Sequence, residues 1–600
     1  MKNNKLISSI AAFVVVGMIV LLSACIRQER HDSDLQAVPE AEFVIGFQRE
    51  PPFDDTVYDY VILNARYINP ETGSDIEGMY IGILGDYVAA VTRRPLTGRN
   101  VIDATGLVAA PGFIDIDTYD PIPFGVRYKI ADGVTTNLLM HGGAPDAAAW
   151  YAIYERSPPN MNYGISNFIT AIRANLGYGI NTIMTNRSDF ERLSNIVEIN
   201  ILNGALGISM SPEYVPGLHY DDMLRLSEIA VKYGIATYYH LRYSTHLGEN
   251  NNLKAVQEVI DIARQTGASV HIMHITSTGS TYVVEEAFDM IDRARDEGLD
   301  ITVDIYPYDS WATYLNSARF SAGWQDRFGL TYSDLQVPNS SETLTEETFN
   351  IYRRQGLLVI ANGSIPENEV QYALQKPYVF IASDQILGVN LNGHPRGAGS
   401  FSRTIGRYAR ELGVITLMDA IAKVSFLPAQ RLESASADMK RKGRIEVGSD
   451  ADIVLFDYST IIDRATNDNV AVFSEGIKYV FINGKLVYEN GVINELRAGK
   501  PIKNYLVHPE IRPQTQPFGS LTGYLVYDGK YFVSLADAAS EYDVEYVNNT
   551  DGKQIFGNAE LFVGLTRYNI HGQNSHLLHE PIVYRGKIFI LIDDLEKLLH

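Results

Sequence analysis

Residues 236–308 read ATYYHLRYSTHLGENNNLKAVQEVIDIARQTGASVHIMHITSTGSTYVVEEAFDMIDRARDEGLDITVDIYPY. The segment contains three short apolar runs, ATYYH, SVHIMHI and LDITVDIYPY. Between them lie two longer stretches, at 253–267 and 283–298, whose apolar residues recur at the three- and four-residue spacing of an amphipathic helix. Strands that alternate with helices in this way are typical of βα units and a parallel sheet.

The same alternation extends over residues 111–439, where about eight such units can be counted. Eight units predict an α/β fold of the (β/α)8 TIM-barrel type, whose chemistry lies at the carboxyl ends of the strands. Two strand-rich segments flank this region, at 56–110 and 440–500. We expect them to pair with each other in a small composite β-sandwich, with a hairpin turn at Asn483-Gly484.

Polar residues stand at the ends of several predicted strands. His240 and His274 each close one apolar run, and Asp384 closes the run YVFIASD. Tyr306 and Tyr308 follow a fourth. A single polar residue at a strand end is usually a hydrogen-bonded rim residue, but several at the same end of a barrel indicate a site.

Several motifs of this region resemble one protein family. They are VIDATGLVAAPGFIDIDTYD at 101–120, HLR at 240–242, HIMHI around His274, DIYPY at 304–308, IASD at 381–384 and HPRGAGSFSRTIGRYARE at 394–411. In order and spacing they resemble N-acyl-D-amino-acid deacylases of the amidohydrolase superfamily. The resemblance covers about residues 58–494.

The resemblance implies a metal site. In the family, two strand histidines bind the tightly held metal, and His240 and His274 match them. Asp384 matches the aspartate that serves as general base and ligand. The family's His-x-His pair on the first strand is Asp117-Thr118-Tyr119 here. Asp117 can still ligate through oxygen, whereas Tyr119 is a poor replacement.

A further family ligand, a cysteine, falls on Gly142 in the segment GVTTNLLMHGG. His141 is adjacent, but a shift of one residue on an extended strand turns the side chain to the other face. We therefore expect His141 to point away, with a role as ligand as the alternative. The remaining residues predict one divalent ion. Zinc ranks first for imidazole ligands, and added carboxylates would favour manganese or iron.

The predicted substrate contacts are also partly retained. Arg396 matches an arginine that binds the substrate carboxylate, and Tyr306 or Tyr308 would assist it. The alternative for Arg396 is a salt bridge that tethers a loop. Arg242 could play either role. Thr276 stands where family members often carry a lysine, which weakens the prediction of an N-acyl amino acid as substrate.

The composition excludes some partners. The chain has 600 residues, of which 46% are apolar, and its formal charge is −22, from 50 Lys and Arg against 72 Asp and Glu. A protein this acidic is repelled by a phosphate backbone, so nucleic acid is not an expected partner. The single cysteine, Cys25, excludes an intramolecular disulfide.

The first 25 residues, MKNNKLISSIAAFVVVGMIVLLSAC, have the order of a secretion signal. Their end resembles the lipobox of bacterial lipoproteins, so we expect residues 1–24 to be removed and Cys25 to carry lipid. Residues 25–55 would be a flexible tether. This predicts export and anchoring to the outer face of the bacterial cell membrane. The alternative is an uncleaved membrane anchor with an incidental cysteine.

The last predicted domain spans residues 517–600. The stretch Val526–Asp537 recurs as Val583–Asp594, each a hairpin followed by a helix. The unit resembles the copper-amine-oxidase-like stalk domain of exported bacterial proteins, which predicts a small α+β fold and contact with the cell envelope. We find no copper site, and interpret four histidines as surface residues: His571, His576, His579 and His600.

Two functions remain open at this point. The first is a metal-dependent hydrolase of a non-peptide C–N bond, with an acylated amino acid or related amide as its small-molecule substrate. The second is an inactive barrel that serves as a surface binding or scaffolding protein, which the replacements at Asp117, Tyr119 and Gly142 favour. Fold alone does not decide between them.

Overall fold

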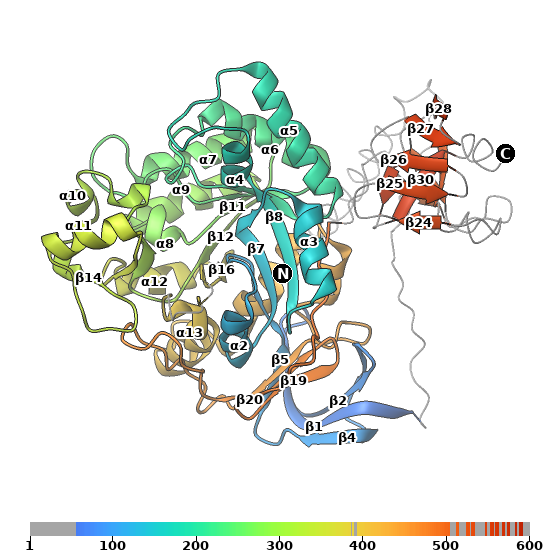
Figure 1. The fold of residues 1–600 in the computed structure, drawn as a ribbon. Helices are drawn as coiled ribbons and strands as arrows, with labels where there is room; N and C mark the ends of the chain where they lie inside the picture. Colours follow the sequence, from blue (N-terminus) through green and yellow to red (C-terminus); the bar gives the residue numbers. More distant parts are fainter. Residues whose placement is uncertain are drawn as a thin grey trace, which may run out of the picture. The chain divides into compact units, whose positions relative to one another are not determined.

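The computed structural model describes residues 56–504, apart from 386 and 389–392, together with short strands between 512 and 591 (Figure 1). The predicted signal peptide, Cys25 and the tether lie outside the described residues. Among the residues that are described, no helix is long and apolar enough to cross a membrane.

The centre of the molecule is a barrel of eight parallel strands whose neighbours in the sheet are also neighbours in the chain. They are β6 (Phe113–Asp115), β7 (Val134–Ala144), β8 (Asn162–Phe168), β9 (Gly207–Met210), β10 (Ala236–Tyr239), β11 (Val270–Ile272), β12 (Ile301–Ile305) and β16 (Val379–Ile381). The seam between the first and last strands is closed beyond their ends, where the Asp384 N–H donates to the Asp117 carbonyl at 2.8 Å. The predicted (β/α)8 fold is confirmed.

Helices surround this barrel (Figure 1). They are α2 (Pro123–Ala131), α3 (Ala147–Arg156), α4 (Ile169–Asn175), α5 (Arg187–Leu202), α6 (Tyr220–Tyr233), α7 (Asn252–Thr266), α8 (Ile275–Thr278), α9 (Val284–Asp296), α12 (Glu367–Leu374), α13 (Arg396–Arg403), α14 (Leu417–Ile421) and α15 (Leu427–Leu432). Helix α7 shows how the sequence sets their bounds. The Asn251 side chain caps it by accepting from the Lys254 N–H, and Gly267 ends it at φ +73°. Its buried face, which includes Val256 and Val259, packs into the barrel core.

The two flanking segments join in one nine-stranded sheet. Its strands are β1 (Val57–Asn69), β2 (Ser74–Leu84), β3 (Tyr87–Thr92), β4 (Thr97–Asp103), β5 (Val108–Pro111), β17 (Ile453–Phe456), β18 (Ile477–Ile482), β19 (Lys485–Glu489) and β20 (Val492–Ile493). The segments meet where β5 pairs with β17. The turn between β18 and β19 has positive φ at Asn483 and Gly484, +48° and +74°. A side chain at Gly484 would lie 1.9 Å from the Gly85 carbonyl, so the turn requires glycine.

An insertion that the sequence patterns did not predict follows β12. It contains a three-stranded antiparallel sheet of β13 (Trp311–Tyr314), β14 (Leu335–Gln336) and β15 (Leu358–Ala361), with helices α10 (Trp324–Phe328) and α11 (Glu346–Gln355). Its loop between β13 and α10 brings Arg319 towards the barrel mouth, where this side chain is 3% exposed.

The C-terminal region contains two five-stranded antiparallel sheets. One comprises β21 (Arg512–Gln514), β22 (Tyr524–Tyr527), β23 (Lys530–Ser534), β29 (Ile582–Tyr584) and β30 (Lys587–Leu591); the other comprises β24 (Tyr546–Asn548), β25 (Lys553–Phe556), β26 (Ala559–Phe562), β27 (Arg567–Ile570) and β28 (Gln573–His576). The hairpins β22–β23 and β29–β30 lie at the two sequence repeats. The helices expected after them fall outside the described residues, and the stalk-domain resemblance stays a prediction.

Candidate active site

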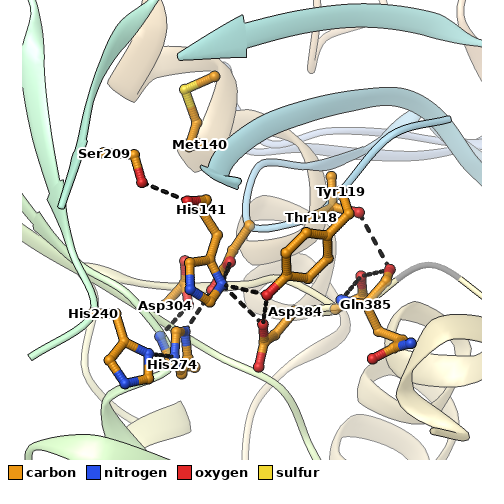
Figure 2. A network of polar contacts seen from close by, with 12 residues as sticks. Thr118, Tyr119, Met140, His141, Ser209, His240, His274, Asp304, Asp384 and Gln385 are labelled. Carbon is orange, nitrogen blue, oxygen red and sulfur yellow. Dashed lines mark hydrogen bonds and ion pairs between the residues drawn. The ribbon is translucent and has the colours of Figure 1, made fainter. Parts of the chain in front are cut away.

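The predicted metal ligands meet at the carboxyl end of the barrel (Figure 2). His240 directly follows β10, His274 follows β11 and begins α8, and Asp384 follows β16. Asp117 follows β6, and its side chain is within 2.7 Å of His274. All four side chains are buried. Strand ends from distant parts of the sequence therefore bring these residues together as the barrel pattern predicts.

His240 and His274 face each other. Nε2 of His240 lies 2.7 Å from Oε2 of Glu213, and Nδ1 of His274 lies 2.7 Å from Oδ2 of Asp117. An ionised carboxylate only accepts hydrogen bonds, so these two nitrogens donate. The remaining nitrogens, Nδ1 of His240 and Nε2 of His274, lie 2.7 Å apart. Both nitrogens are then free to bind a metal ion through their lone pairs.

His141 joins them as a third imidazole. Its Nδ1 lies 3.0 Å from Oδ1 of Asp384 and 3.2 Å from Oδ1 of Asp117. The ring centroids of His240 and His274 are 5.5 and 5.0 Å from that of His141, whose other nitrogen is turned towards them (Figure 2). One ligand atom from each of the three histidines lies within 4.8 Å of the others. Each imidazole is thus held from behind by a carboxylate.

The expectation that His141 points away from the site is wrong. It assumed that β7 is a regular strand with alternating faces. Instead, the pairing of β7 with β8 shifts in register between Leu139 and Ala144. Gly143 within this bulge has φ +76°, a conformation that favours glycine. The bulge turns the His141 side chain into the mouth, one residue before Gly142.

The electrostatics of the cluster differ between its histidines. Burial alone would lower the pKa of His141, but the carboxylates of Asp117 and Asp384 raise it to about 10. Burial lowers the pKa of His240 to about 4, although its hydrogen bond with Glu213 opposes this shift. Near neutral pH the metal-free site therefore carries a positive charge on His141 and a neutral ring at His240. A divalent ion bound to His141 would displace the proton that carries this charge.

Two of the converging residues have unusual backbones. His274 has φ +31° and Asp384 has φ +47°. Non-glycine residues in this region cost about 1–3 kcal/mol each and persist only where their surroundings hold them. The His274 N–H donates to Oδ1 of Asp304 at 2.6 Å, and the Asp384 N–H donates to the Asp117 carbonyl at 2.8 Å. The fold thus maintains strain at the two positions that aim these side chains.

Arg396 lies behind Asp384. Its Nη2 is 2.9 Å from Oδ2 of Asp384, and its guanidinium lies 4.3 Å from the centre of the Tyr306 ring. Burial opposes ionisation of Asp384, but Arg396 and His274 lower its pKa, so it is a carboxylate at neutral pH. Nε and Nη1 of Arg396 and the Tyr306 hydroxyl are buried without hydrogen-bond partners, which leaves them available to a ligand.

The other two predicted substrate contacts are engaged elsewhere. Arg242 pairs with Glu258 at 3.0 Å and donates to the Leu218 carbonyl at 2.9 Å. The Tyr308 hydroxyl donates to Asp463 at 3.1 Å. These contacts give both residues a structural role, and the prediction that they bind substrate gains no support.

Sequence reasoning missed two further residues of the site. Glu213 stands three residues after β9, and the strand-end rule that found His240 would have found it. Arg319 comes from the insertion after β12, which no sequence pattern predicted. Its Nη1 lies 3.8 Å from Oε2 of Glu213, and its Nε is buried without a partner.

A second buried polar cluster lies one layer deeper. Asp115 precedes Asp117 by two residues on the same face of the chain. Lys129 pairs with Asp115 and lies 3.0 and 3.1 Å from Oδ1 of Asn137 and Oγ of Ser383. Both oxygens of Asp115 also accept from Ser383, at 3.0 Å from its N–H and 2.5 Å from its hydroxyl. This cluster is closed to ligands because its charges are fully paired.

The family model described as "Amidohydrolase family" matches residues 117–487, more than half of the chain. The protein belongs to the amidohydrolase family. The match begins at Asp117 and includes every residue of the cluster described above.

Individual relatives of this amidohydrolase are deacylases. An N-acyl-D-glutamate deacylase of Alcaligenes xylosoxydans xylosoxydans is 29% identical over 457 residues, covering 69% of this chain and 89% of that protein. A D-aminoacylase of the same organism is 26% identical over 491 residues, covering 74% and 98%. The crystal structure of N-acyl-D-glutamate deacylase from Bordetella bronchiseptica, complexed with zinc and a phosphonate inhibitor, superposes with TM-score 0.64 at 24% identity, covering 75% and 100%.

The site of this amidohydrolase fits a divalent metal ion. Three imidazoles converge, and Oδ1 of Asp117 is buried beside them without a hydrogen bond. Nitrogen ligands with a nearby carboxylate oxygen suit zinc and also manganese or iron. The carboxylates behind the rings, at Glu213, Asp117 and Asp384, are the partners that orient metal-binding histidines in proteins. The three imidazoles and the free oxygen of Asp117 therefore form a donor set that suits a divalent ion.

Proposed function

We propose that this amidohydrolase is a metal-dependent hydrolase of a non-peptide C–N bond in N-acyl amino acids or closely related amides. The observation that carries the proposal is the facing pair of ring nitrogens of His240 and His274, 2.7 Å apart, with a third imidazole beside them. We propose one ion per chain, held by His141, His240 and His274 with Asp117 adjacent. Zinc is the first choice.

Such an ion would polarise the amide carbonyl and lower the pKa of a water molecule. The residues of the chain carry the rest of the reaction. Asp384 is an ionised carboxylate at the mouth and is the base that takes the proton from the attacking water. It then gives this proton to the amide nitrogen as the C–N bond breaks, leaving a carboxylic acid and a free amine.

The substrate side is cationic and has unpaired hydrogen-bond donors. Arg396 keeps two unpartnered nitrogens, and Arg319 keeps one. The hydroxyls of Tyr306 and Thr276 are also buried without partners. Donors of this kind suit a carboxylate, because buried donors left unpaired are costly until a ligand satisfies them. We therefore propose that the amino-acid carboxylate lies against Arg396 and Tyr306, with Arg319 available to a second acidic group.

The names of the relatives support this choice. The two similar proteins from Alcaligenes are an N-acyl-D-glutamate deacylase and a D-aminoacylase, both hydrolases of N-acyl-D-amino acids. The family match places this chain among amidohydrolases. A D-configured, acidic N-acyl amino acid is accordingly the first substrate to try.

A direct assay tests the proposal. The zinc-loaded full chain is incubated with N-acetyl-D-glutamate, N-acetyl-D-leucine and their L forms, and the released amino acid is measured. We expect turnover of D substrates that a chelator abolishes and zinc restores, and a loss of at least about a hundredfold in Asp384→Asn, because removing a general base costs this much. Glu258→Gln, which changes a carboxylate outside the cluster, serves as the control. A zinc-loaded protein that hydrolyses none of these amides would favour the binding or scaffolding function.

We also propose that the protein is exported and anchored through lipid on Cys25, with the C-terminal region as a stalk-like domain at the cell envelope. The order of charged, apolar and small residues before Cys25 supports this location. Cys25→Ala should leave the protein unprocessed or soluble. Unchanged partitioning into membranes would contradict the lipid anchor.

A further inference from the structure

Tyr119 lies across one side of the cluster. Its hydroxyl is 3.1 Å from Nδ1 of His141 and donates a longer bond, 3.5 Å, to Oδ1 of Asp384 (Figure 2). Its ring lies 5.4 Å from that of His141, centre to centre, at an angle of 45°. The phenol thus contacts two potential metal ligands through one oxygen.

Gly142 makes room for this ring. A Cβ atom at Gly142 would lie 3.2 Å from Cδ1 and 3.7 Å from Cε1 of Tyr119, closer than ordinary packing allows at the nearer atom. The backbone has little freedom to retreat, because a Cβ at the neighbouring Gly143 would lie 2.4 Å from the Ser166 carbonyl. Any larger side chain at 142 would therefore compete with the Tyr119 ring for the same space.

The cluster offers two overlapping sets of ligand atoms. One set is His141, His240 and His274; the other is Asp117, His141, His274 and Asp384. In the second set, Nδ1 of His141 and Oδ1 of Asp384 lie 3.0 Å apart, and the Tyr119 hydroxyl contacts both atoms. Oδ2 of Asp384 is engaged by Arg396 at 2.9 Å.

We propose that Tyr119 and Gly142 act as a pair that closes the second position, so that the chain holds a single ion among its three histidines. The inference rests on the metal site of the proposed function and adds what limits that site to one ion. Tyr119 positions the ligands without binding the ion: its ring occupies the space beside His141 and Asp384, and its hydroxyl contacts both. Gly142 is the partner that allows the ring to lie there.

The pair can be separated by substitution. Tyr119→His removes the ring and hydroxyl and adds a ligand, and should open the second position. Tyr119→His combined with Gly142→Cys adds a second ligand in the vacated space. Tyr119→Phe keeps the bulk of the ring and should keep the position closed. Tyr314→His, at a tyrosine in β13 that is 50% exposed, controls for zinc bound by any introduced histidine.

Metal content after equilibration with zinc and removal of free ion is the readout, with Mn²⁺ electron paramagnetic resonance to detect neighbouring ions. We expect one ion in the wild type, Tyr119→Phe and Tyr314→His. We expect two in the double variant, with the spectrum of a coupled manganese pair. Tyr119→His should bind a second ion at least about tenfold more weakly than the double variant, because it has one ligand fewer.

The outcomes separate the two proposals. A wild type with two ions overturns the closure by Tyr119 while leaving the proposed function intact. A double variant that folds and still holds one ion also overturns it. A wild type with no ion overturns the metal site of the proposed function, and the closure with it.

Discussion

The barrel contains two buried polar clusters one layer apart, and they differ in how completely their atoms are paired. In the deeper one, Lys129 and Asp115 form an ion pair whose remaining hydrogen-bonding positions are taken by Thr118, Asn137 and Ser383. At the mouth, the His240 and His274 nitrogens face each other and Oδ1 of Asp117 accepts no hydrogen bond. Both clusters are buried and include aspartates, but of the two only the one at the mouth contains imidazoles.

The difference teaches that burial of charge alone does not mark a functional site. A fully paired cluster contributes by holding strand ends together, and it has no capacity left for a ligand. A cluster with open valences costs stability until a ligand fills them. The deeper cluster should therefore affect folding, and the upper one metal binding.

Lys129→Met is expected to have the largest effect on stability. It leaves the Asp115 carboxylate buried without its cation, which costs about 3–5 kcal/mol of unfolding free energy. Urea unfolding of the zinc-free protein measures it. Lys129→Met with Asp115→Asn, which removes the orphaned charge, should recover part of the loss. A change below about 1 kcal/mol in the single variant would contradict the assignment of this cluster to folding.

Glu213→Gln is expected to weaken zinc binding about 10–100-fold, because a carboxylate behind a metal-binding histidine orients the ring and raises its basicity. Calorimetric titration with zinc gives the affinity. The matched control is Glu258→Gln, which removes a carboxylate that pairs with Arg242 in the barrel wall. Equal affinities in wild type and Glu213→Gln would show that His240 is not oriented through Glu213.

Zinc affinity should also rise with pH. The raised pKa of His141, about 10, means that this ring is protonated throughout the neutral range in the metal-free protein. An ion that binds His141 must displace one proton, so the affinity should increase about tenfold for each pH unit between pH 6 and 8. Titrations in buffers of different ionisation enthalpy count the released protons. Binding that releases none would exclude His141 from the ligands.

The sequence predicted the parts of this site that depend on regular strands. His240, His274 and Asp384 follow short parallel strands, so their position at the mouth comes directly from the βα pattern. His141 was misplaced because its direction depends on a bulge at Gly143, and the alternation rule holds only for an unbroken strand.

The remaining contacts depend on tertiary structure that no local pattern contains. Lys129 meets Ser383 across 254 residues of chain. Arg319 reaches the barrel mouth from an insertion that the helix and strand patterns of the sequence did not predict. In the sequence, Tyr119 and Gly142 appear only as two separate replacements of family ligands. Only the distance between them in the structure shows that Gly142 leaves room for the Tyr119 ring.

The metal content of the purified wild type, compared with His141→Ala, His240→Ala and His274→Ala, tests the central claim most directly. After equilibration with zinc and removal of free ion, the open cluster predicts one equivalent of zinc in the wild type and less than about a tenth in each variant, because each loses one of three imidazole ligands. All four proteins should remain folded by circular dichroism. A folded wild type that retains no zinc, manganese or iron, or a His141→Ala variant that retains a full equivalent, would contradict the three-histidine site.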